Sequence, residues 1–513
     1  MPATSIRPSN PEPVSLTSIA RLLGQPEADL PDIAVTGVAM SSRDVADGDL
    51  YVGIPGARVH GAKFASDAID QGARAVLTDA AGSVLVKQAH LAVPVIETDD
   101  PRAVLGTVSG LVYGTTANDP VLYGVTGTNG KTSCAYMLAA VIEQLGRRPG
   151  LSTTVERRIG DERVESALTS PEASDMHALI ARMREVGVDA AAIEVSAQAL
   201  TRHRVEGLVF DTVGFLNLAH DHLDEYASFD DYFDAKLQLF TPAHARRGVV
   251  SLDSEWGRQL ADRAEIPVTT IACGADAGAD WRVDVLDASG PSTEFELTSP
   301  DGQTLRTRVP LPGWFSAANA GMSIAMLVTS GIPFDEIRSA LERDGEIRVT
   351  VPGRTELLNP GGGPKFYLDY GHTPEAFRQT LKALRALTPG RLFMIFGADG
   401  DRDATKRPEM GRVSAELADE VIITDYNPRT EDPAAIRAVL LDAAREAAPE
   451  KTIREIPNAA EGIRAAVAAA SEGDTILIAG PGHETHSEVG GQKIEYSARD
   501  EAVRALREAG WPA

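Results

Sequence analysis

Residues 121–146 read VLYGVTGTNGKTSCAYMLAAVIEQLG and form the clearest strand–loop–helix unit in the chain. An apolar run enters a glycine-rich turn, and a long amphipathic helix leaves it. Gly124, Gly127 and Gly130 come just before Lys131. Glycine lets backbone N–H groups approach phosphate oxygens closely, and the N-terminus of the following helix is positive. The stretch therefore predicts a phosphate-binding loop.

The side chains at the end of this loop indicate a nucleoside triphosphate and Mg²⁺. Lys131 can reach the β- and γ-phosphates, and Thr132 can ligate the metal. The strict pattern for such loops places glycine five residues before Gly130, where Val125 stands, so the GTNGKT spacing is a variant. The alternative is a glycine-rich turn with a solvated lysine. We predict an ATP site that also uses Gly127, Thr128, Asn129 and Gly130.

The rest of the chain is organised as α/β throughout. Residues 1–118 alternate short apolar runs with a helical stretch, and we expect the first ten, rich in Pro and Ser, to lack fixed structure. TTANDP (residues 115–120) is a predicted linker to a central domain at 119–346. Residues 347–513 alternate strands with helices, which predicts a parallel sheet covered on both faces. Three domains are expected.

Composition narrows the class of protein. The 513 residues carry a formal net charge of -25, which disfavours binding to nucleic acid or to a membrane surface. The two cysteines, Cys134 and Cys273, lack metal or disulfide spacing and are predicted to be reduced core residues. The start, MPATSIRPSN, does not predict a signal peptide, and no apolar run approaches the roughly 18 residues of a membrane span. We expect a soluble, cytoplasmic monomer.

A series of further motifs accompanies the loop. In chain order they are SSRDVADGDLYVGIPG, GTNGKT, EVSAQAL, DHLD followed by AK, VPGRTE, DYGHTPEA, GDRDATKRPEMG, YNPRTEDP and GPGHE. In these motifs the chain resembles the Mur ligases over nearly its whole length, and among them the tripeptide-forming type. The resemblance implies a uridine-nucleotide domain, a central ATP domain with a mostly parallel sheet, and a Rossmann-like C-terminal domain that brings the incoming amino acid.

The resemblance also assigns the metal chemistry. It implies that Glu194 of EVSAQAL and His222 of DHLD ligate Mg²⁺ together with Thr132, with two ions in the site. It implies that Lys236 carries a carbamate, and that Lys131, Glu194, His222 and Lys236 are catalytic. Alternatives remain: Glu194 can be a cap or salt-bridge residue, His222 an ordinary loop histidine, and Lys236 an unmodified lysine.

Contacts to the two nucleotides follow from the same resemblance. Ser42 matches a contact to the uridine diphosphate, and Asn319, Arg354, Asp369 and His372 match residues on the ATP side. The residues that match contacts to the muramoyl peptide are Thr169, Ser170, Ser196 and Arg204. Each can instead be an ordinary polar residue, and Asp369 can be the N-cap of the helix after Pro374.

The predicted amino-acid pocket is where the resemblance is weakest. The matching residues are Arg407, Asn427, Arg429, Gly480 and Glu484. Tyr426 stands where the family commonly has Asp, and Pro481 replaces a lysine. Arg429 can bind a carboxylate and Glu484 an ammonium group. The tyrosine favours a lysine-like substrate over meso-diaminopimelate, whereas the retained arginine points the other way.

The resulting hypothesis is an ATP-dependent ligase for peptidoglycan precursors. It would add a diamino acid to UDP-N-acetylmuramoyl-L-alanyl-D-glutamate through an acyl phosphate. Alternatives are a related ligase with a folate-type or specialised-metabolite acceptor, and a non-catalytic nucleotide switch. A dehydrogenase is disfavoured, because no GxGxxG motif follows the first strand.

Overall fold

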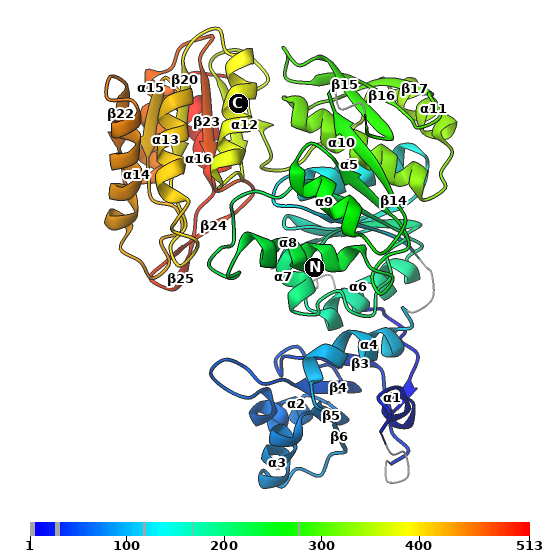
Figure 1. Cartoon of the computed structure of the whole chain (residues 1–513). Coiled ribbons are helices and arrows are strands. Elements are labelled where there is room, and N and C mark those ends of the chain that lie inside the picture. Colours follow the sequence, from blue (N-terminus) through cyan, green and yellow to red (C-terminus); the bar gives the residue numbers. More distant parts are fainter. Residues whose placement is uncertain (1–5, 26–30, 116–119, 167, 275–277) are drawn as a thin grey trace.

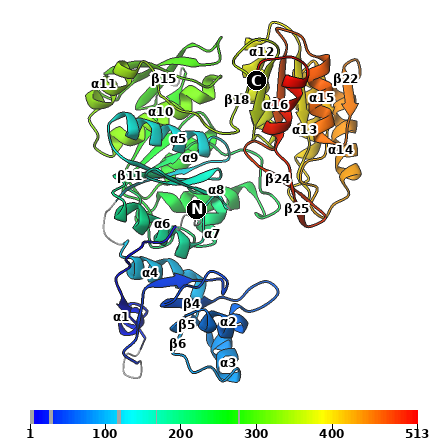
Figure 2. The same ribbon diagram turned by 180° about the vertical axis from the view of Figure 1, so that it is seen from behind.

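The computed structural model describes residues 6–25, 31–115, 120–166, 168–274 and 278–513. They form three α/β domains (Figure 1). The N-terminal domain lies below the central one, and the C-terminal domain lies beside it, as the view from behind also shows (Figure 2). The predicted α/β class with three domains is confirmed.

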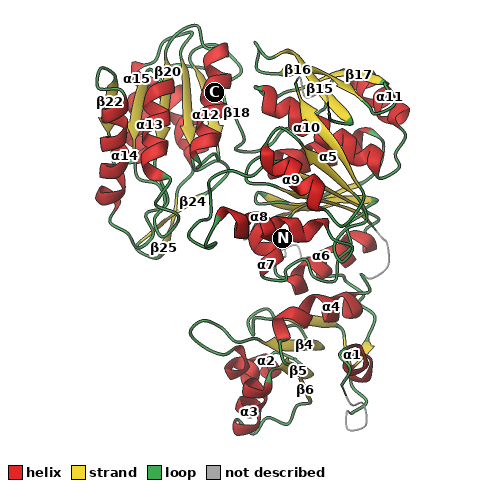
Figure 3. Cartoon of the chain, in the orientation of Figure 1, coloured by secondary structure: helices red, strands yellow, loops and turns green. Residues whose placement is uncertain are grey.

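The N-terminal domain is a small parallel sheet with helices packed on it (Figure 3). Its sheet has the order β3-β4-β5-β6, and all three pairings are parallel. Its elements are β1 (Val14–Ser15), α1 (Leu16–Leu22), β2 (Ala34–Val35), β3 (Gly37–Ala39), β4 (Asp49–Gly53), η1 (Gly61–Phe64), α2 (Ala65–Asp70), β5 (Ala75–Thr78), α3 (Ala80–Gln88), β6 (Val95–Glu97) and α4 (Pro101–Tyr113).

The central domain is built on one large sheet. In the described residues its order is β10-β9-β8-β11-β7-β12-β13-β14-β15-β16-β17, parallel from β8 to β15 and antiparallel at both ends. Its elements are β7 (Val121–Thr126), α5 (Lys131–Gln144), β8 (Pro149–Ser152), β9 (Glu156–Ile159), β10 (Glu162–Glu165), α6 (Ala173–Glu185), β11 (Ala190–Glu194), α7 (Ala197–Thr201), β12 (Thr212–Phe215), α8 (Phe229–Leu237), η2 (Gln238–Phe240), β13 (Gly248–Ser251), α9 (Glu255–Arg263), β14 (Val268–Cys273), β15 (Trp281–Asp287), β16 (Thr293–Thr298), β17 (Thr304–Val309), α10 (Trp314–Thr329) and α11 (Phe334–Asp344).

The C-terminal domain has a second parallel sheet, with the order β18-β19-β23-β20-β21-β22 and an antiparallel β18 at its edge. Helices lie on both faces, as expected for a Rossmann-like fold (Figure 1). Its elements are β18 (Glu356–Leu357), β19 (Lys365–Asp369), α12 (Pro374–Leu387), β20 (Leu392–Phe396), α13 (Arg407–Leu417), β21 (Glu420–Ile423), α14 (Pro433–Ala447), β22 (Thr452–Glu455), α15 (Ala459–Ala469), β23 (Thr475–Ala479), β24 (His486–Val489), β25 (Gln492–Glu495) and α16 (Ala498–Glu508).

Burial explains why the central strands read as continuous apolar runs. Strand β11 is buried along its whole length, and β7 is buried except at Val121, because helices cover the sheet on both sides. Helices α5 and α10 pack against each other on one face and share a core with Val125, Met137 and Met326. This packing fixes the direction in which the loop between β7 and α5 points.

Two expectations about the chain need correction. The first ten residues are not without structure where they are described. Arg7 forms a 2.7 Å ion pair with Asp49, and the backbone N–H of Ser9 donates to Glu185. Cys134 is buried as expected, but Cys273 is only half-buried and lines a cavity.

Two further expectations concern the TTANDP linker and membrane-spanning helices. Residues 116–119 of the TTANDP linker, and with them the boundary at 118, lie outside the described residues. Within the described ranges, no helix is both long enough and apolar enough to cross a bilayer.

The contact between the first two domains leaves no room for a side chain at Gly106 in α4. A Cβ there would lie 2.1 Å from the carbonyl oxygen of Glu206. We expect Gly106→Val to lower the free energy of unfolding by about 1–3 kcal/mol, because backbone must shift to make space. The measurement is the urea midpoint followed by circular dichroism. The control is Thr107→Ala, at an exposed position of the same helix. Equal midpoints for both variants would contradict the tight contact.

Candidate active site

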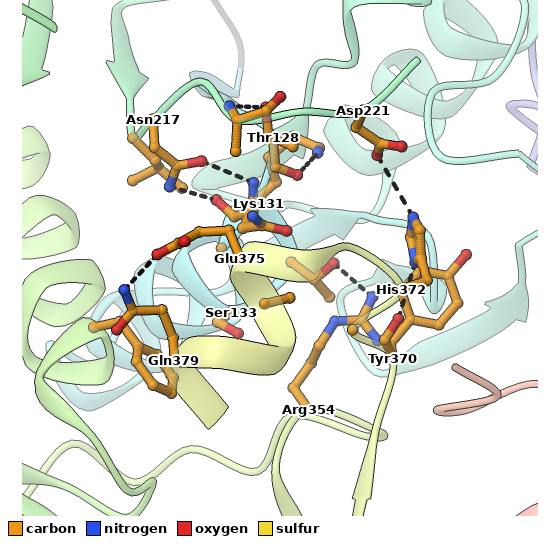
Figure 4. A pocket seen from close by; sticks show the side chains of 18 of the residues that line it. Thr128, Lys131, Ser133, Asn217, Asp221, Arg354, Tyr370, His372, Glu375 and Gln379 are labelled. Atoms are coloured by element: carbon orange, nitrogen blue, oxygen red, sulfur yellow. Dashed lines mark hydrogen bonds and ion pairs between the residues drawn. The ribbon is translucent and has the colours of Figure 1, made fainter. Parts of the chain in front are cut away.

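A cavity of about 960 Å³ lies between the central and C-terminal domains (Figure 4). The carboxyl ends of parallel strands from both sheets surround it, which is where open α/β sheets bind ligands. Most of the predicted site residues line this one cavity: Thr128, Asn129, Gly130, Lys131, Thr132, Thr169, Glu194, Ser196, Arg204, His222, Asn319, Arg354, Asp369, His372, Arg429 and Glu484.

The predicted phosphate loop connects β7 to α5 at the edge of the cavity. Gly130 is the N-cap of α5 with φ of 90°, and a Cβ there would lie 2.8 Å from the side-chain oxygen of Asn319. The loop is held by Asn217, two residues after β12, whose side-chain oxygen accepts from the N–H of Asn129 at 2.9 Å and whose amide donates to the carbonyl of Asn129 at 3.1 Å. Asn217 was not among the predicted site residues, because no motif marks it.

Two lysines meet at one carbonyl of this loop. Lys131 Nζ donates to the carbonyl oxygens of Gly127 at 2.9 Å and Thr128 at 3.0 Å, and Lys236 Nζ donates to Gly127 at 3.1 Å. Burial and the charge of Lys131 hold the pKa of Lys236 well below its usual value. Burial also lowers the pKa of Lys131, against the pull of Glu194 and Asp221. The loop therefore brings two amines with lowered pKa values together at the positive N-terminus of α5, a place suited to an anion.

Glu194 supplies a buried carboxylate next to the loop. It ends β11 and lies in register with Val125 of β7, so it sits beside the strand that leads into the loop. The N–H and hydroxyl of Thr154 both donate to it at 3.2 Å. The hydroxyl of Thr132 accepts from Arg354 at 3.0 Å. Both groups are oxygen ligands of the kind that Mg²⁺ prefers.

Protein side chains alone do not form a metal cage here. Among the described residues, no group of three His, Cys, Asp or Glu side chains is placed to hold a metal ion. Such a site still fits Mg²⁺, which is usually bound by one or two protein oxygens together with substrate phosphates. His222 lines the cavity but its Nδ1 lies 3.0 Å from the side-chain amide of Gln198. Burial lowers the pKa of His222 to about 4, so its ring is neutral at pH 7.

The C-terminal domain contributes Arg354 and Asp369, which the sequence places on the ATP side, to the lining of the cavity. The guanidinium of Arg354 lies 4.2 Å above the ring of Tyr370 (Figure 4). Asp369, the last residue of β19, accepts from the N–H of Thr355 at 2.6 Å and thereby holds the loop that carries Arg354. The N-cap of α12 is Thr373, so the alternative reading of Asp369 as that cap is wrong.

A cluster centred on Asp221 joins the two domains at the far side of the cavity. Lys406 forms a 2.9 Å ion pair with Asp221, and the rings of His222 and His372 lie 3.5 Å and 3.6 Å from the same carboxylate. Burial alone would raise the pKa of Asp221, but the hydrogen bond from His372 and the charge of Lys406 hold it well below its usual value. Neither Asp221 nor Lys406 was among the predicted site residues.

The four residues that match contacts to the muramoyl peptide make different kinds of contact within the protein: an ion pair, hydrogen bonds and a helix N-cap. Arg204 is paired with Glu172 at 2.8 Å, and Thr169 accepts from Thr154 at 3.0 Å. The hydroxyl of Ser170 is buried and donates to the carbonyl of Glu194, and Ser196 is the N-cap of α7. The predicted site residues outside the cavity lining are Ser42, Gly127, Ser170, Lys236, Arg407, Asn427 and Gly480.

The predicted amino-acid residues gather on the loops after β20, β21 and β23. Glu484 accepts from the amide of Asn427 at 3.2 Å. Asn427 and Arg429 both have positive φ, 40° and 50°, a strained conformation that is concentrated at functional sites. Arg407 is held by Glu431 at 2.8 Å instead of facing the cavity. Gly480 packs on the ring of Tyr426.

Family models cover each of the three domains. Residues 34–113 match "Mur ligase family, catalytic domain", residues 125–327 match "Mur ligase middle domain", and residues 353–482 match "Mur ligase, glutamate ligase domain".

Individual proteins match over nearly the whole length. The chain is 54% identical over 509 residues to "UDP-N-acetylmuramyl-tripeptide synthetase" of Leifsonia xyli, covering 99% of both chains. It is 42% identical to "UDP-N-acetylmuramoyl-L-alanyl-D-glutamate--2,6-diaminopimelate ligase" of Streptomyces avermitilis, covering 94% of this chain and 95% of that one. A solved structure of a protein with this second name has a TM-score of 0.67 at 25% identity, covering 97% of this chain and 100% of the other. With its phosphate loop placed between two α/β domains, the chain belongs to the Mur ligase family and is an ATP-dependent ligase.

Proposed function

We propose that this chain adds a diamino acid to UDP-N-acetylmuramoyl-L-alanyl-D-glutamate in the synthesis of peptidoglycan precursors. The observation that carries the proposal is the single cavity in which Lys131, Glu194 and Glu484 all lie, because it offers one space for the triphosphate, the metal and an amino group. The names of the two relatives, a tripeptide synthetase and a diaminopimelate ligase, support the same acceptor.

The first step forms the acyl phosphate. The D-glutamyl γ-carboxylate attacks the γ-phosphorus of ATP, the bond to the β,γ-bridging oxygen breaks, and ADP leaves. Lys131 and the backbone amides of residues 130–132, at the start of α5, neutralise the triphosphate charge, which is the main source of acceleration in phosphoryl transfer. Thr132, Glu194 and His222 would hold Mg²⁺. When bound, that ion supplies charge neutralisation at the phosphate oxygens.

The second step joins the amino acid. Its α-amine attacks the acyl carbon, phosphate leaves, and the amine loses a proton. An acyl phosphate hydrolyses in water, so the two domains must exclude solvent while it exists. The contacts of Arg354 with Thr132 and of Asp221 with Lys406 hold the two domains together beside the cavity.

The remaining assignments belong to the same proposal. The N-terminal domain, with Ser42, holds the uridine nucleotide, and Thr169, Ser196 and Arg204 contact the muramoyl peptide. The domain boundaries near residues 118 and 346, a monomeric state and a cytoplasmic location stay predictions. Lys236 carries a carbamate, in which its neutral amine has attacked CO₂ and lost one proton. The lowered pKa of Lys236 supports this, because only the neutral amine reacts.

The phosphate loop is tested at its lysine. We expect Lys131→Ala to lower kcat for phosphate release by at least about 10²-fold, because the triphosphate loses its positioned charge. Thermal unfolding should stay unchanged, since Lys131 bonds only to its own loop. The control is Lys87→Ala on an exposed position of α3. Normal turnover by Lys131→Ala would refute the loop assignment.

The amino acid is tested with a panel. With the UDP-muramoyl dipeptide and ATP, we expect phosphate release with L-lysine or L-ornithine, and weaker release with meso-diaminopimelate, because Tyr426 occupies part of the pocket. Mass spectrometry identifies the product. No release with any diamino acid would refute the proposed substrate, and release with a folate acceptor instead would favour the related ligase.

Carbamylation of Lys236 is tested directly with ¹³C-bicarbonate. We expect a carbamate ¹³C signal in the parent protein that is absent from Lys236→Arg. The signal should fall as the pH is lowered through the depressed pKa of Lys236, because protonation removes the reactive amine. Above that pKa the signal should be full. Its absence at pH 8 in the parent would show that Lys236 is unmodified.

A further inference from the structure

One tyrosine closes the amino-acid end of the cavity. Tyr426 lines the cavity, and its ring packs against Gly480, where a Cβ would lie 3.4 Å away. On its other side a Cβ at Gly397 would lie 2.8 Å from the Cβ of Tyr426. The backbone of residue 426 therefore lies tightly against the loop after β20, while its phenol ring packs in van der Waals contact against the loop after β23.

The hydroxyl of Tyr426 fixes the carboxylate of Glu484. It donates to Oε2 at 2.9 Å, and the amide of Asn427 donates to the same oxygen at 3.2 Å. Burial raises the pKa of Tyr426 well above its usual value, so the phenol stays a donor. With both donors on Oε2, Oε1 is the oxygen through which Glu484 can accept from a bound ammonium group.

The arginines beside this carboxylate are already neutralised. Arg429 lies 3.3 Å from both Asp399 and Glu488. Arg407 is held by Glu431 through two hydrogen bonds of 2.8 Å and 2.9 Å. Acidic groups therefore outnumber these arginines: the carboxylates are Asp399, Glu431, Glu484 and Glu488. Such a charge balance attracts a cation and repels a second carboxylate.

Arg402 is another arginine of the cavity lining, on the loop after β20, and its side chain is exposed. Water and salt screen the charge of such a group, so it attracts a carboxylate less than a buried arginine does. It does not offset the acidic surroundings of Glu484.

The geometry points to Tyr426 as the residue that determines which amino acid this ligase accepts. Its ring limits the length of the side chain, and its hydroxyl holds Glu484 in place to bind one terminal ammonium group. The pocket thus selects an amino acid with a single cationic end and excludes one that also carries a terminal carboxylate. This inference rests on the proposed function, because it concerns the amino-acid substrate of that reaction.

The test compares two substitutions of Tyr426. Tyr426→Ala opens the end of the pocket, and we expect the ratio of kcat/KM for meso-diaminopimelate to that for L-lysine to rise at least about tenfold, the effect of roughly one methylene-sized space. Tyr426→Phe keeps the ring but frees Glu484, so KM for L-lysine should rise several-fold while kcat, KM for ATP and the ratio stay unchanged. The matched control is Tyr496→Phe, a tyrosine of the same domain outside the cavity lining.

Binding measurements separate this inference from the proposed function. L-lysine and meso-diaminopimelate are each titrated by calorimetry into the parent and into Tyr426→Ala. A non-hydrolysable ATP analogue and the UDP-muramoyl dipeptide are present, so the titration measures the Kd of each amino acid without turnover. A parent that binds L-lysine but releases no phosphate would refute the proposed reaction alone. A preference that is unchanged within twofold in Tyr426→Ala, or that shifts only with Arg402→Ala, would overturn the role of Tyr426.

Discussion

The carbonyl oxygen of Gly127 accepts hydrogen bonds from the amines of Lys131 and Lys236, and the rest of the site is arranged around this point. The two lysines come from different helices, and burial lowers the pKa of both amines. Lys131 lies at the N-terminus of α5, where the helix dipole is positive. The phosphates of a bound triphosphate would be stabilised by the positive potential at this helix end.

Each of the two domains supplies part of the site. In the central domain, Glu194 ends β11, and Thr132 lies at the start of α5, just after the neighbouring strand β7. A metal and phosphate would meet between these two residues. The C-terminal sheet presents Asp369, Glu484 and the strained loop around Asn427 at its own carboxyl edge. Since neither domain holds the full set, the reaction depends on their contact, which Arg354 and the Asp221 cluster provide. A ligase that must protect an acyl phosphate from water benefits from a site that is complete only when closed.

Local sequence patterns predicted the structural features that depend only on residues close together in the chain. The run from Val121 to Gly146 gave both the strand–loop–helix unit and the lysine, because apolar periodicity and glycine spacing are local signals. The position of Asp369 at a strand end likewise followed from the apolar residues before it. Family motifs identified Glu194 and Glu484, which no local pattern would have separated from ordinary acidic residues.

What the sequence could not predict are pairings between distant segments. Asn217 holds the phosphate loop from the segment after β12, Lys406 pairs with Asp221 across a domain contact, and Arg7 reaches Asp49 from a segment that reads as unstructured. Each partner is an ordinary polar residue in the sequence, and only the fold brings the two together. The role of Tyr426 also needed the structure, because its hydroxyl reaches Glu484 on another loop.

The most direct measurement is a crystal structure of the protein soaked with a non-hydrolysable ATP analogue and Mg²⁺. The β- and γ-phosphates should lie within hydrogen-bond distance of the amides of residues 130–132, with Lys131 turned from the Gly127 carbonyl to the phosphate oxygens and the metal beside Thr132 and Glu194. A loop left without phosphate, with the nucleotide bound elsewhere and both lysines still on the Gly127 carbonyl, would contradict the account.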